Sequence, residues 1–358
     1  MIDGKKTIYW HVDAAKPDPE IIRETGAIIR RGGLVAFPTE TVYGLGASAL
    51  DDGAVADIFR AKGRPQDNPL IVHLADLDRV WGLVVDVPPA ALALMEKFWP
   101  GPLTVILKDG GVVAPRVRAG LDTVALRMPD HPVALALIRA AGVPVAAPSA
   151  NLSGRPSPTT AEHVKADLDG RIDALLDGGP AGLGVESTVL DLSGGIPILL
   201  RPGGITPGQI KSVAGEIILD PSLESGGPVS GRPRSPGMKY RHYAPSAPLV
   251  LLEGSPAGMI KEIRLLIEEA VIRGDRVGVI CREENAALYP GAVVVPAGMA
   301  DNPAGVAAEL YGALRRMDLL GVDLILAEGV EPLGMGLAVV NRLRRAAVKI
   351  VNIGAARE

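Results

Sequence analysis

Two basic side chains, Lys62 and Arg64, stand close together at the predicted end of a helix, with Asn68 just beyond them. Arginine supplies a fork of hydrogen-bond donors and lysine a point charge, so the pair could clamp a polyphosphate. Cations at a helix C-terminus are also stabilised by the helix dipole alone. The spacing leaves both the binding and the structural interpretation open.

A hydroxyl-rich loop, Pro38–Gly46, directly follows the apolar run Leu34–Phe37. Ligand sites of open α/β sheets gather where strands end, and glycines let a backbone approach a ligand closely. Thr39 and Thr41 would supply hydroxyls there. The alternative is an ordinary loop from a strand to a helix.

A second polar loop, Pro148–Gly154, follows the apolar run Val143–Ala147, which predicts a central strand. Hydroxyl and amide donors such as Ser149 and Asn151 at the end of a central strand suit phosphate or carboxylate binding. Serine and asparagine also favour turns and helix starts, so a structural role stays open.

Arg127 stands inside the otherwise apolar strand predicted over Thr123–Met128. A buried, unpaired charge costs several kcal/mol, so we expect an anionic partner for it, from the protein or from a ligand. Ser187 and Arg201 likewise lie at predicted strand ends. Together these residues predict a concave pocket for an anionic ligand. No obvious nucleophile or general base joins them, which fits chemistry done by neutralising and positioning phosphates.

Several familiar motifs are missing from the sequence. There is no standard phosphate loop, no dinucleotide-binding fingerprint and no G-x-S-x-G nucleophile elbow. The histidines are far apart and none has the i, i+4 spacing of a metal site.

The elements that must position these residues are short strands and helices in mixed order. Asp51 and Asp52 can cap a helix that runs to about Lys62, and Ser187–Leu192 with Ile198–Arg201 predicts a hairpin. Further strands are predicted over Pro69–Leu74 and Leu103–Leu107, and helices over Pro88–Trp99 and His131–Ala141. Because strands both alternate with helices and follow one another, we expect residues 1–219 to form a mixed sheet with helices.

Residues 220–247 are rich in proline, glycine and serine, which predicts a linker. The linker is also basic and aromatic, with Arg232, Arg234, Lys239, Tyr240, Arg241 and Tyr243. It could be a plain spacer, or part of it could fold back over an anionic site.

Strands and helices alternate cleanly from residue 248 to 358. Strands are expected at Leu249–Leu252, Arg276–Cys281, Ala292–Pro296 and Asp323–Ala327, and helices at Ala257–Arg273, Asn302–Leu320 and Leu337–Val348. This order predicts a smaller, Rossmann-like parallel α/β domain.

The composition is that of a globular protein. In 358 residues, 37 basic and 41 acidic side chains give a net charge of −4, which argues against a chain whose bulk binds nucleic acid. The single cysteine, Cys281, rules out an intramolecular disulfide and a multi-cysteine zinc site. No signal peptide or membrane-spanning run is visible, so we expect a soluble, cytoplasmic protein.

In their order along the chain, these motifs resemble those of the threonylcarbamoyl-AMP synthase family, in its long form with a YrdC-like N-terminal domain. The matching stretches are PTETVYGLGA (Pro38–Ala47), KGRP with NPL (Lys62–Leu70), FWPGPLT (Phe98–Thr104), LRMP (Leu126–Pro129), APSAN-SG (Ala147–Gly154), ESTV (Glu186–Val189), LRPG (Leu200–Gly203) and SPGMKYRHYAP (Ser235–Pro245). The match is dense over the first part of the chain and the linker, and weak beyond them. It implies a YrdC-like twisted sheet around a concave pocket.

The resemblance implies a reaction in which L-threonine, bicarbonate and ATP, with Mg²⁺, give threonylcarbamoyl-AMP and pyrophosphate. Other proteins then transfer the threonylcarbamoyl group to a tRNA adenosine next to the anticodon, and direct tRNA binding stays open. By position in the motifs, Lys62 and Arg64 are the implied catalytic residues. The implied ATP-binding residues are Lys62, Arg64, Asn68, Thr123, Ser149, Asn151, Ser157, Arg201 and Tyr243, and the implied threonine-binding residues are Thr41, His73, Arg127, Ala147 and Ser187.

Three other hypotheses have less support. A carbamoyltransferase of the hydrogenase-maturation type would be longer and rich in cysteine. An RNA-binding module would call for a more basic and more aromatic chain. The C-terminal domain could bind a regulatory nucleotide or a protein, although it carries no phosphate-binding fingerprint.

Overall fold

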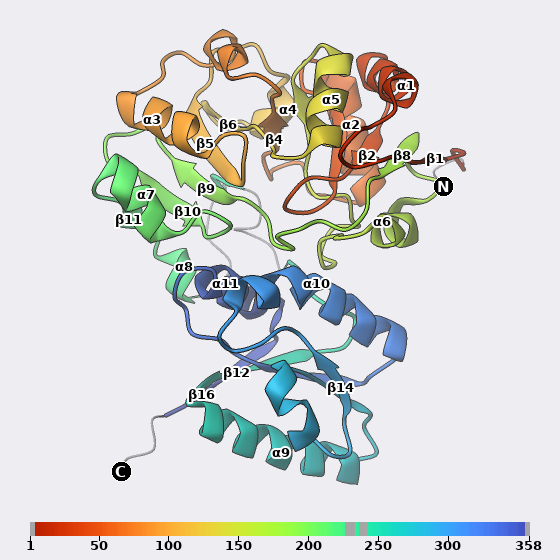
Figure 1. The fold of residues 1–358 in the computed structure, drawn as a ribbon, viewed down its shortest axis with the longest axis vertical. Helices are drawn as coiled ribbons and strands as arrows, with labels where there is room; N and C mark the ends of the chain where they lie inside the picture. Colours follow the sequence, from red (N-terminus) through yellow and green to blue (C-terminus); the bar gives the residue numbers. More distant parts are fainter. Residues whose placement is uncertain (1–3, 226–232, 236–241, 355–358) are drawn as a thin grey trace. The chain divides into compact units, whose positions relative to one another are not determined.

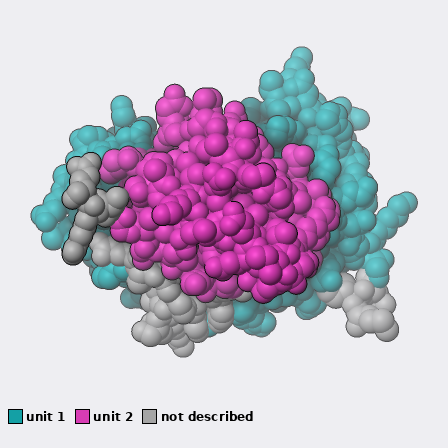
Figure 2. All heavy atoms as spheres, turned by 90° about the horizontal axis from the view of Figure 1, so that it is seen from below, with its two compact units in different colours: residues 1–153, 157–240 teal, residues 154–156, 241–358 magenta. Residues whose placement is uncertain are grey.

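The computed structural model describes residues 4–225, 233–235 and 242–354, which form two compact units. Unit 1 comprises residues 1–153 and 157–240, and unit 2 residues 154–156 and 241–358 (Figures 1 and 2). The predicted boundaries at 219/220 and 247/248 stay predictions. Of the linker residues singled out above, Arg232, Lys239, Tyr240 and Arg241 lie outside the described residues.

An eleven-stranded mixed sheet forms the centre of unit 1, as the element order predicted (Figure 1). Its order is β1-β8-β2-β3-β7-β4-β6-β5-β9-β10-β11. The strands are β1 (Ile8–His11), β2 (Val35–Phe37), β3 (Gly44–Ser48), β4 (Ile71–His73), β5 (Leu103–Lys108), β6 (Thr123–Arg127), β7 (Val145–Ala146), β8 (Ala174–Asp177), β9 (Thr188–Asp191), β10 (Ile198–Arg201) and β11 (Ile218–Leu219). The predicted hairpin of β9 and β10 is antiparallel, and β7 is central.

The helices of unit 1 are α1 (Pro19–Arg30), α2 (Asp52–Lys62), η1 (Leu77–Gly82, a 3-10 helix), α3 (Pro89–Phe98), α4 (Pro115–Arg118), α5 (Pro132–Ala141), α6 (Ala161–Leu168), α7 (Pro207–Ala214) and α8 (Ser222–Ser225). Asp51 caps α2 by accepting from the backbone N–H groups of Gly53 and Ala54. Gly63, in the left-handed region, ends the same helix and leaves Lys62 as its last residue. None of the helices in the described residues is both long and apolar enough to cross a membrane.

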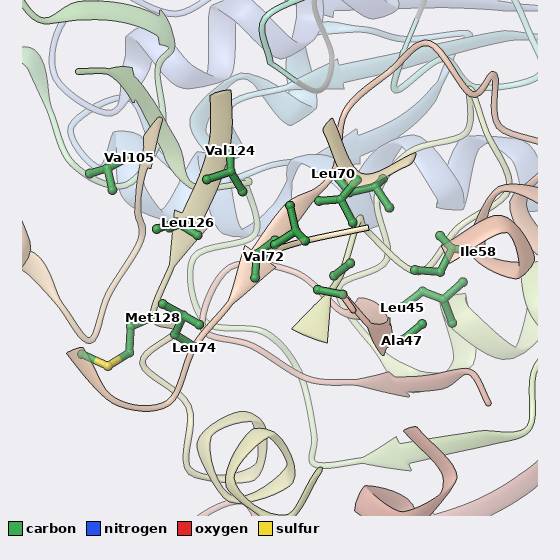
Figure 3. Close-up of a cluster of buried hydrophobic side chains, with 14 of the residues drawn as sticks. Leu45, Ala47, Ile58, Leu70, Val72, Leu74, Val105, Val124, Leu126 and Met128 are labelled. Atoms are coloured by element: carbon green, nitrogen blue, oxygen red, sulfur yellow. The ribbon is translucent and has the colours of Figure 1, made fainter. Parts of the chain in front are cut away.

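The main core of unit 1 lies on one face of this sheet, where aliphatic side chains from neighbouring strands meet. Leu45, Val72, Val105 and Leu126 pack there together with Ile58 of α2 (Figure 3). Burying such side chains contributes about 1.5–3 kcal/mol each, before the opposing conformational entropy is counted.

The other face of the sheet is covered at one end by α1 and α5, with Val133 and Leu137 of α5 packed beside Phe37. The two helices approach closely at Gly26, where a Cβ atom would lie 2.8 Å from that of Ala140. Farther along this face lies a small apolar group: Ile71, Ile106, Ala125, Val189 and Leu200. Polar side chains continue the face from there.

The segment after Phe37 returns as strand β3 and not as a loop to a helix, so the simpler of the two interpretations of Pro38–Gly46 was wrong. Glycine is a poor strand former, which hid the strand from the sequence. The reason for the glycine is space: a Cβ atom at Gly46 would lie 2.8 Å from both the Phe37 ring and Val145. The missed strand matters because it turns the threonine-rich loop back into the middle of the sheet.

Unit 2 has a five-stranded, all-parallel sheet in the order β14-β13-β15-β12-β16, the predicted Rossmann-like arrangement. The strands are β12 (Leu249–Gly254), β13 (Val277–Cys281), β14 (Val293–Pro296), β15 (Leu324–Glu328) and β16 (Lys349–Ile353), the last of which was not predicted. The helices are α9 (Pro256–Ile272), η2 (Glu283–Leu288, a 3-10 helix), α10 (Pro303–Leu320) and α11 (Gly336–Ala346). Within the unit, α9 lies on one face of the sheet, and α10 and α11 lie on the other (Figure 1).

Candidate active site

The two polar loops of unit 1 meet edge to edge. The backbone N–H of Leu45 donates to Pro148 O, and that of Ala150 donates to Tyr43 O, each at 2.8 Å. A backbone bridge also pairs Gly44 with Ser149. Two stretches about a hundred residues apart in the sequence therefore form one wall of a site.

Lys62 is buried against this wall and orders it. Its Nζ donates to the carbonyl oxygens of Ser149 and Asn151 at 2.5 and 2.6 Å, and lies 3.4 Å from Asn151 Oδ1. An ammonium group has three donors, and these contacts occupy them. In this structure Lys62 fixes the shape of the loop, so a direct contact to phosphate requires one of these bonds to be exchanged.

Arg64 and Asn68 lie beside each other, also buried. Arg64 Nη2 donates to the carbonyl oxygens of Asn68 and Pro69, at 3.3 and 3.1 Å. The side-chain amide of Asn68, 1% exposed, makes no hydrogen bond within the described residues. Buried amides are almost always hydrogen-bonded, so this one is available to a ligand.

Arg127 ends β6 and faces Glu40 and Thr41. Its Nη2 lies 2.7 Å from Glu40 Oε1 and donates to Thr41 Oγ1 at 2.8 Å. The Arg127 and Glu40 side chains are 5% and 14% exposed. The expectation of an anionic partner for Arg127 is confirmed, and the partner comes from the protein. Glu40 was missed as a site residue, although its position between two threonines after a strand was a visible signal.

His73, Arg127 and Thr104 stand side by side across β4, β6 and β5. Arg127 is in register with both of the others, so all three side chains lie on one face. Burial, and then the charge of Arg127, lowers the pKa of His73 to about 3, so the imidazole is neutral near pH 7. Its Nδ1 lies 3.2 Å from Ile71 O, and its ring packs at right angles to the Phe37 ring, with centroids 6.4 Å apart.

The hydroxyl of Ser187 joins this row through Thr104, at an Oγ–Oγ1 distance of 2.8 Å. Arg201 holds Ser187 from the other side: its Nε donates to Ser187 O at 3.0 Å and its Nη2 to Ser187 Oγ at 3.2 Å. Gly203 lies so close to the backbone of Glu186–Thr188 that a Cβ atom would overlap it. The strand-end residues Ser187 and Arg201 are thus brought together, as their positions predicted.

Ser157 is buried and donates to Glu186 Oε1 at 2.5 Å. Glu186 is a second acid that was not singled out. A carboxylate that accepts from a serine can fix which way the hydroxyl oxygen points.

Three implied residues lie apart from these contacts. Thr123 begins β6, in register with Lys108, at the opposite end of the strand from Arg127. Ala147 contributes backbone, donating its N–H to Ile71 O at 2.9 Å. Tyr243, described within unit 2, stacks on Tyr311 with ring centroids 5.3 Å apart and lies beneath the guanidinium of Arg342. The roles that the resemblance implies for these three stay predictions.

The arrangement offers two kinds of binding chemistry along the two loops that are joined edge to edge. Arg127, Glu40 and Thr41 present a cation, an anion and a hydroxyl within a few ångströms of one another. Lys62, Arg64 and the Ser149–Asn151 loop present cations and amide and hydroxyl donors. The first group complements an amino acid and the second a phosphorylated molecule.

Comparison with known proteins agrees with this fold. Residues 27–203 match the Sua5, YciO and YrdC family model, described as "Telomere recombination", and residues 205–348 match the model of the C-terminal domain of threonylcarbamoyl-AMP synthase. The chain is 53% identical to the threonylcarbamoyl-AMP synthase of Bacillus subtilis, over 96% of this chain and 98% of that protein. It is 50% identical to the synthase of Pyrococcus abyssi, over 91% and 93%. The crystal structure of P. abyssi Sua5 complexed with L-threonine superposes with a TM-score of 0.92 at 48% identity, covering 97% of this chain and all of that one.

The fold and the matches define an AMP-transferring enzyme built on a YrdC-like domain. The chain belongs to the threonylcarbamoyl-AMP synthase family, in its two-domain form.

Proposed function

We propose that this chain condenses L-threonine, bicarbonate and ATP into threonylcarbamoyl-AMP and pyrophosphate. The observation that carries the proposal is that Arg127 meets Glu40 and Thr41 of one loop, while Lys62 holds the Ser149–Asn151 loop. The two loops are joined edge to edge. The relative from P. abyssi whose structure contains L-threonine supports it.

Threonine is a zwitterion, and the cluster at Arg127 offers both complementary charges. The Arg127 guanidinium takes the carboxylate, because a planar fork fits two carboxylate oxygens. The Glu40 carboxylate, which accepts no hydrogen bond within the described residues, takes the ammonium group. Thr41, Ser187, neutral His73 and the backbone at Ala147 complete the proposed threonine side.

The triphosphate and nucleoside lie, in this proposal, along the loops that carry the remaining cations and donors. Lys62 keeps the Ser149–Asn151 loop in shape and exchanges one of its bonds for a phosphate oxygen. Arg64 supplies charge, and the unspent amide of Asn68 supplies donors. The other proposed nucleotide contacts are Thr123, Ser157, Arg201 and Tyr243.

The reaction needs two bond-forming steps. The threonine amine, once deprotonated, attacks the carbon of bicarbonate, and loss of water gives a carbamate. A carbamate oxygen then attacks the α-phosphorus of ATP, and the bond to the β-phosphate breaks to release pyrophosphate. The protein contributes proximity and neutralisation of charge, which can supply most of the acceleration in phosphoryl-type transfer.

Mg²⁺ is expected to accompany ATP. No group of three or more histidine, cysteine, aspartate or glutamate side chains suited to a metal gathers in the part of the chain that the structure describes. We propose that the ion is held mainly by the nucleotide's own phosphates and by water, as Mg²⁺ commonly is. When bound, it would neutralise phosphate charge beside Arg64.

The product is a mixed anhydride and therefore an activated donor. We propose that a further protein transfers its threonylcarbamoyl group to the tRNA adenosine next to the anticodon. Direct binding of tRNA by this chain, and its location in the cytoplasm, stay predictions.

The test is the release of pyrophosphate from ATP, measured with and without L-threonine and bicarbonate. We expect release to require both. Arg127→Met should lower kcat/KM for threonine about 100-fold, equivalent to roughly 3 kcal/mol of lost charge-assisted binding.

Arg139→Met is the matched control, because Arg139 also pairs with a carboxylate, Asp76 at 3.1 Å, but is 55% exposed. It should leave the rate within a factor of two or so. Release that proceeds without threonine, or an Arg127→Met enzyme as active as the Arg139→Met enzyme, would contradict the proposal.

A further inference from the structure

Unit 2 has a topological switch point between its two adjacent strands β12 and β15. The chain leaves β12 through α9 to reach β13, and leaves β15 through α11 to reach β16. Since α9 and α11 lie on opposite faces of the sheet (Figure 1), the two connections diverge at the carboxyl ends of these strands. In open parallel sheets, ligands bind in the crevice formed at such a point.

A pocket of about 270 Å³ occupies this place. Its lining includes Glu253 from the end of β12, Arg282 from the end of β13, Gly329 and Glu331 after β15, and Val340 and Arg344 of α11. Every lining residue belongs to unit 2, and none takes part in the candidate active site.

Arg282 is a largely buried cation, and most of its N–H donors make no hydrogen bond within the described residues. Its Nη2 donates to Gly329 O at 2.9 Å, and its Nε lies 4.0 Å from Glu328. The side chain is 12% exposed, and it makes no other side-chain hydrogen bond within the described residues. A guanidinium has five N–H donors, so several remain for a ligand in the pocket.

Arg344 and Glu253 form the opposite case. Arg344 donates to both carboxylate oxygens of Glu253, at 2.8 and 2.9 Å. This fork joins α11 to β12 as a neutral wall of the pocket. Glu331, on the exposed side of the pocket, makes no side-chain hydrogen bond or ion pair within the part of the chain described.

The charges that line the pocket indicate which class of ligand it can bind. Two arginines and two glutamates line the pocket, so it has no excess of positive charge to favour phosphate. Its volume is below the usual range of roughly 300–1,000 Å³ for ligand sites, which argues against a nucleotide. The two groups without a full set of partners, Arg282 and Glu331, are of opposite sign.

We propose that this pocket binds a free α-amino acid, distinct from the threonine of the active site. Its carboxylate lies on the open donors of Arg282, and its ammonium group faces Glu331. The side chain lies against Val340 and its apolar neighbours Val330 and Pro332.

The experiment uses the full-length chain. Protein amino acids other than threonine are screened singly by thermal shift, and the strongest is titrated by calorimetry, alongside its α-keto acid, its decarboxylated amine and inorganic phosphate. We expect saturable binding of the amino acid and at least tenfold weaker binding of the other three compounds. The α-keto acid and phosphate lack the ammonium group, and the decarboxylated amine lacks the carboxylate.

Three variants locate the signal. Arg282→Met and Glu331→Gln should each weaken binding at least tenfold, and Arg127→Met, which removes the active-site cation, should leave it unchanged. Glu331 is exposed, so Glu331→Gln tests the site without disturbing the fold.

Three results would overturn the proposal. They are no saturable binding of any amino acid up to about 10 mM, binding that Arg127→Met abolishes and Arg282→Met does not, and phosphate binding more tightly than every amino acid. None of them bears on threonine-dependent release of pyrophosphate, so the proposed function stands or falls separately.

Discussion

Glu40 in unit 1 and Glu328 in unit 2 are both carboxylates near the end of a strand, but they differ in the hydrogen bonds that they accept. Glu328, 5% exposed, accepts from Asn285 Nδ2 at 2.9 and 3.1 Å, from the backbone N–H of Arg282 at 3.1 Å, and from the hydroxyl of Tyr289. Glu40 has the guanidinium of Arg127 beside it, but neither of its oxygens accepts a hydrogen bond within the described residues.

The difference separates an acid that stabilises the fold from one that we propose binds a ligand. A buried carboxylate surrounded by donors holds its surroundings together, whereas one with unfilled oxygens is under-satisfied until a ligand arrives. The pKa of Tyr289 is raised by burial and by its hydrogen bond to Glu328, which keeps the phenol protonated as a donor. By the same criterion we propose Asn68 as a binding group, since its buried side-chain amide makes no hydrogen bond within the described residues.

The largest expected effect is on stability in unit 2. Glu328→Ala leaves the donors of Asn285, Tyr289 and Arg282 without an acceptor, so we expect the free energy of unfolding to fall by about 3 kcal/mol in urea titrations. Glu331→Ala, on the exposed loop just beyond, should change it by less than about 0.5 kcal/mol. Equal stability of the Glu328→Ala and Glu331→Ala variants would show that Glu328 has no special structural role, and the contrast with Glu40 would be lost.

The second effect is on binding in unit 1. Glu40→Gln keeps the shape of the side chain but removes its charge, so the KM for threonine should rise about tenfold, equivalent to roughly 1.4 kcal/mol, without loss of stability. Glu24→Gln, on the exposed side of α1, serves as the control in the same steady-state assay. A Glu40→Gln enzyme that is destabilised like Glu328→Ala, with KM unchanged, would make Glu40 a structural residue.

The smallest effect concerns pH. Burial and the charge of Arg127 lower the pKa of His73 to about 3, from an ordinary value of 6.5. Below pH 6.5, His73 therefore binds a proton in the unfolded chain but not in the folded chain. The free energy of unfolding falls as the pH drops from 6.5 towards 3. Between pH 6.5 and 5.5 this histidine should account for about 1 kcal/mol.

Urea titrations at several pH values, on the parent and on His73→Gln, measure that contribution as the difference between the two slopes. His11→Gln is the control, because it makes the same substitution at an exposed histidine. If His73→Gln matched the parent, the imidazole would not be held neutral by the active-site face.

Periodicity and capping signals predicted much of the architecture. The cap at Asp51, the end of α2 at Lys62 and the alternation in unit 2 all follow from local patterns that the structure confirms. Strand β3 was missed because its glycines are required by close neighbours that include Val145 at Gly46 and Ala147 at Gly44, both about a hundred residues away in the sequence. Strand propensity, which depends on the local sequence, does not predict such a contact.

The candidate site also has features that the sequence predicts and features that depend on tertiary contacts. An arginine inside an apolar strand predicts that it needs an anion, because the cost of an unpaired buried charge is a local property. That the anion is Glu40 depends on β3 turning the preceding loop back beside β6, which no spacing encodes. Likewise, the three-way use of the Lys62 ammonium by the Ser149–Asn151 loop depends on tertiary contacts alone.

Gly203 has no functional group, yet it sets where one is held. Because the backbone around Ser187 lies flush against it, there is no room at this position for even a methyl group. Any larger residue would have to push that backbone aside, and with it the hydroxyl that Thr104 and Arg201 hold between them. In this enzyme the absence of a side chain is as much a part of the site's geometry as the charged groups that surround it.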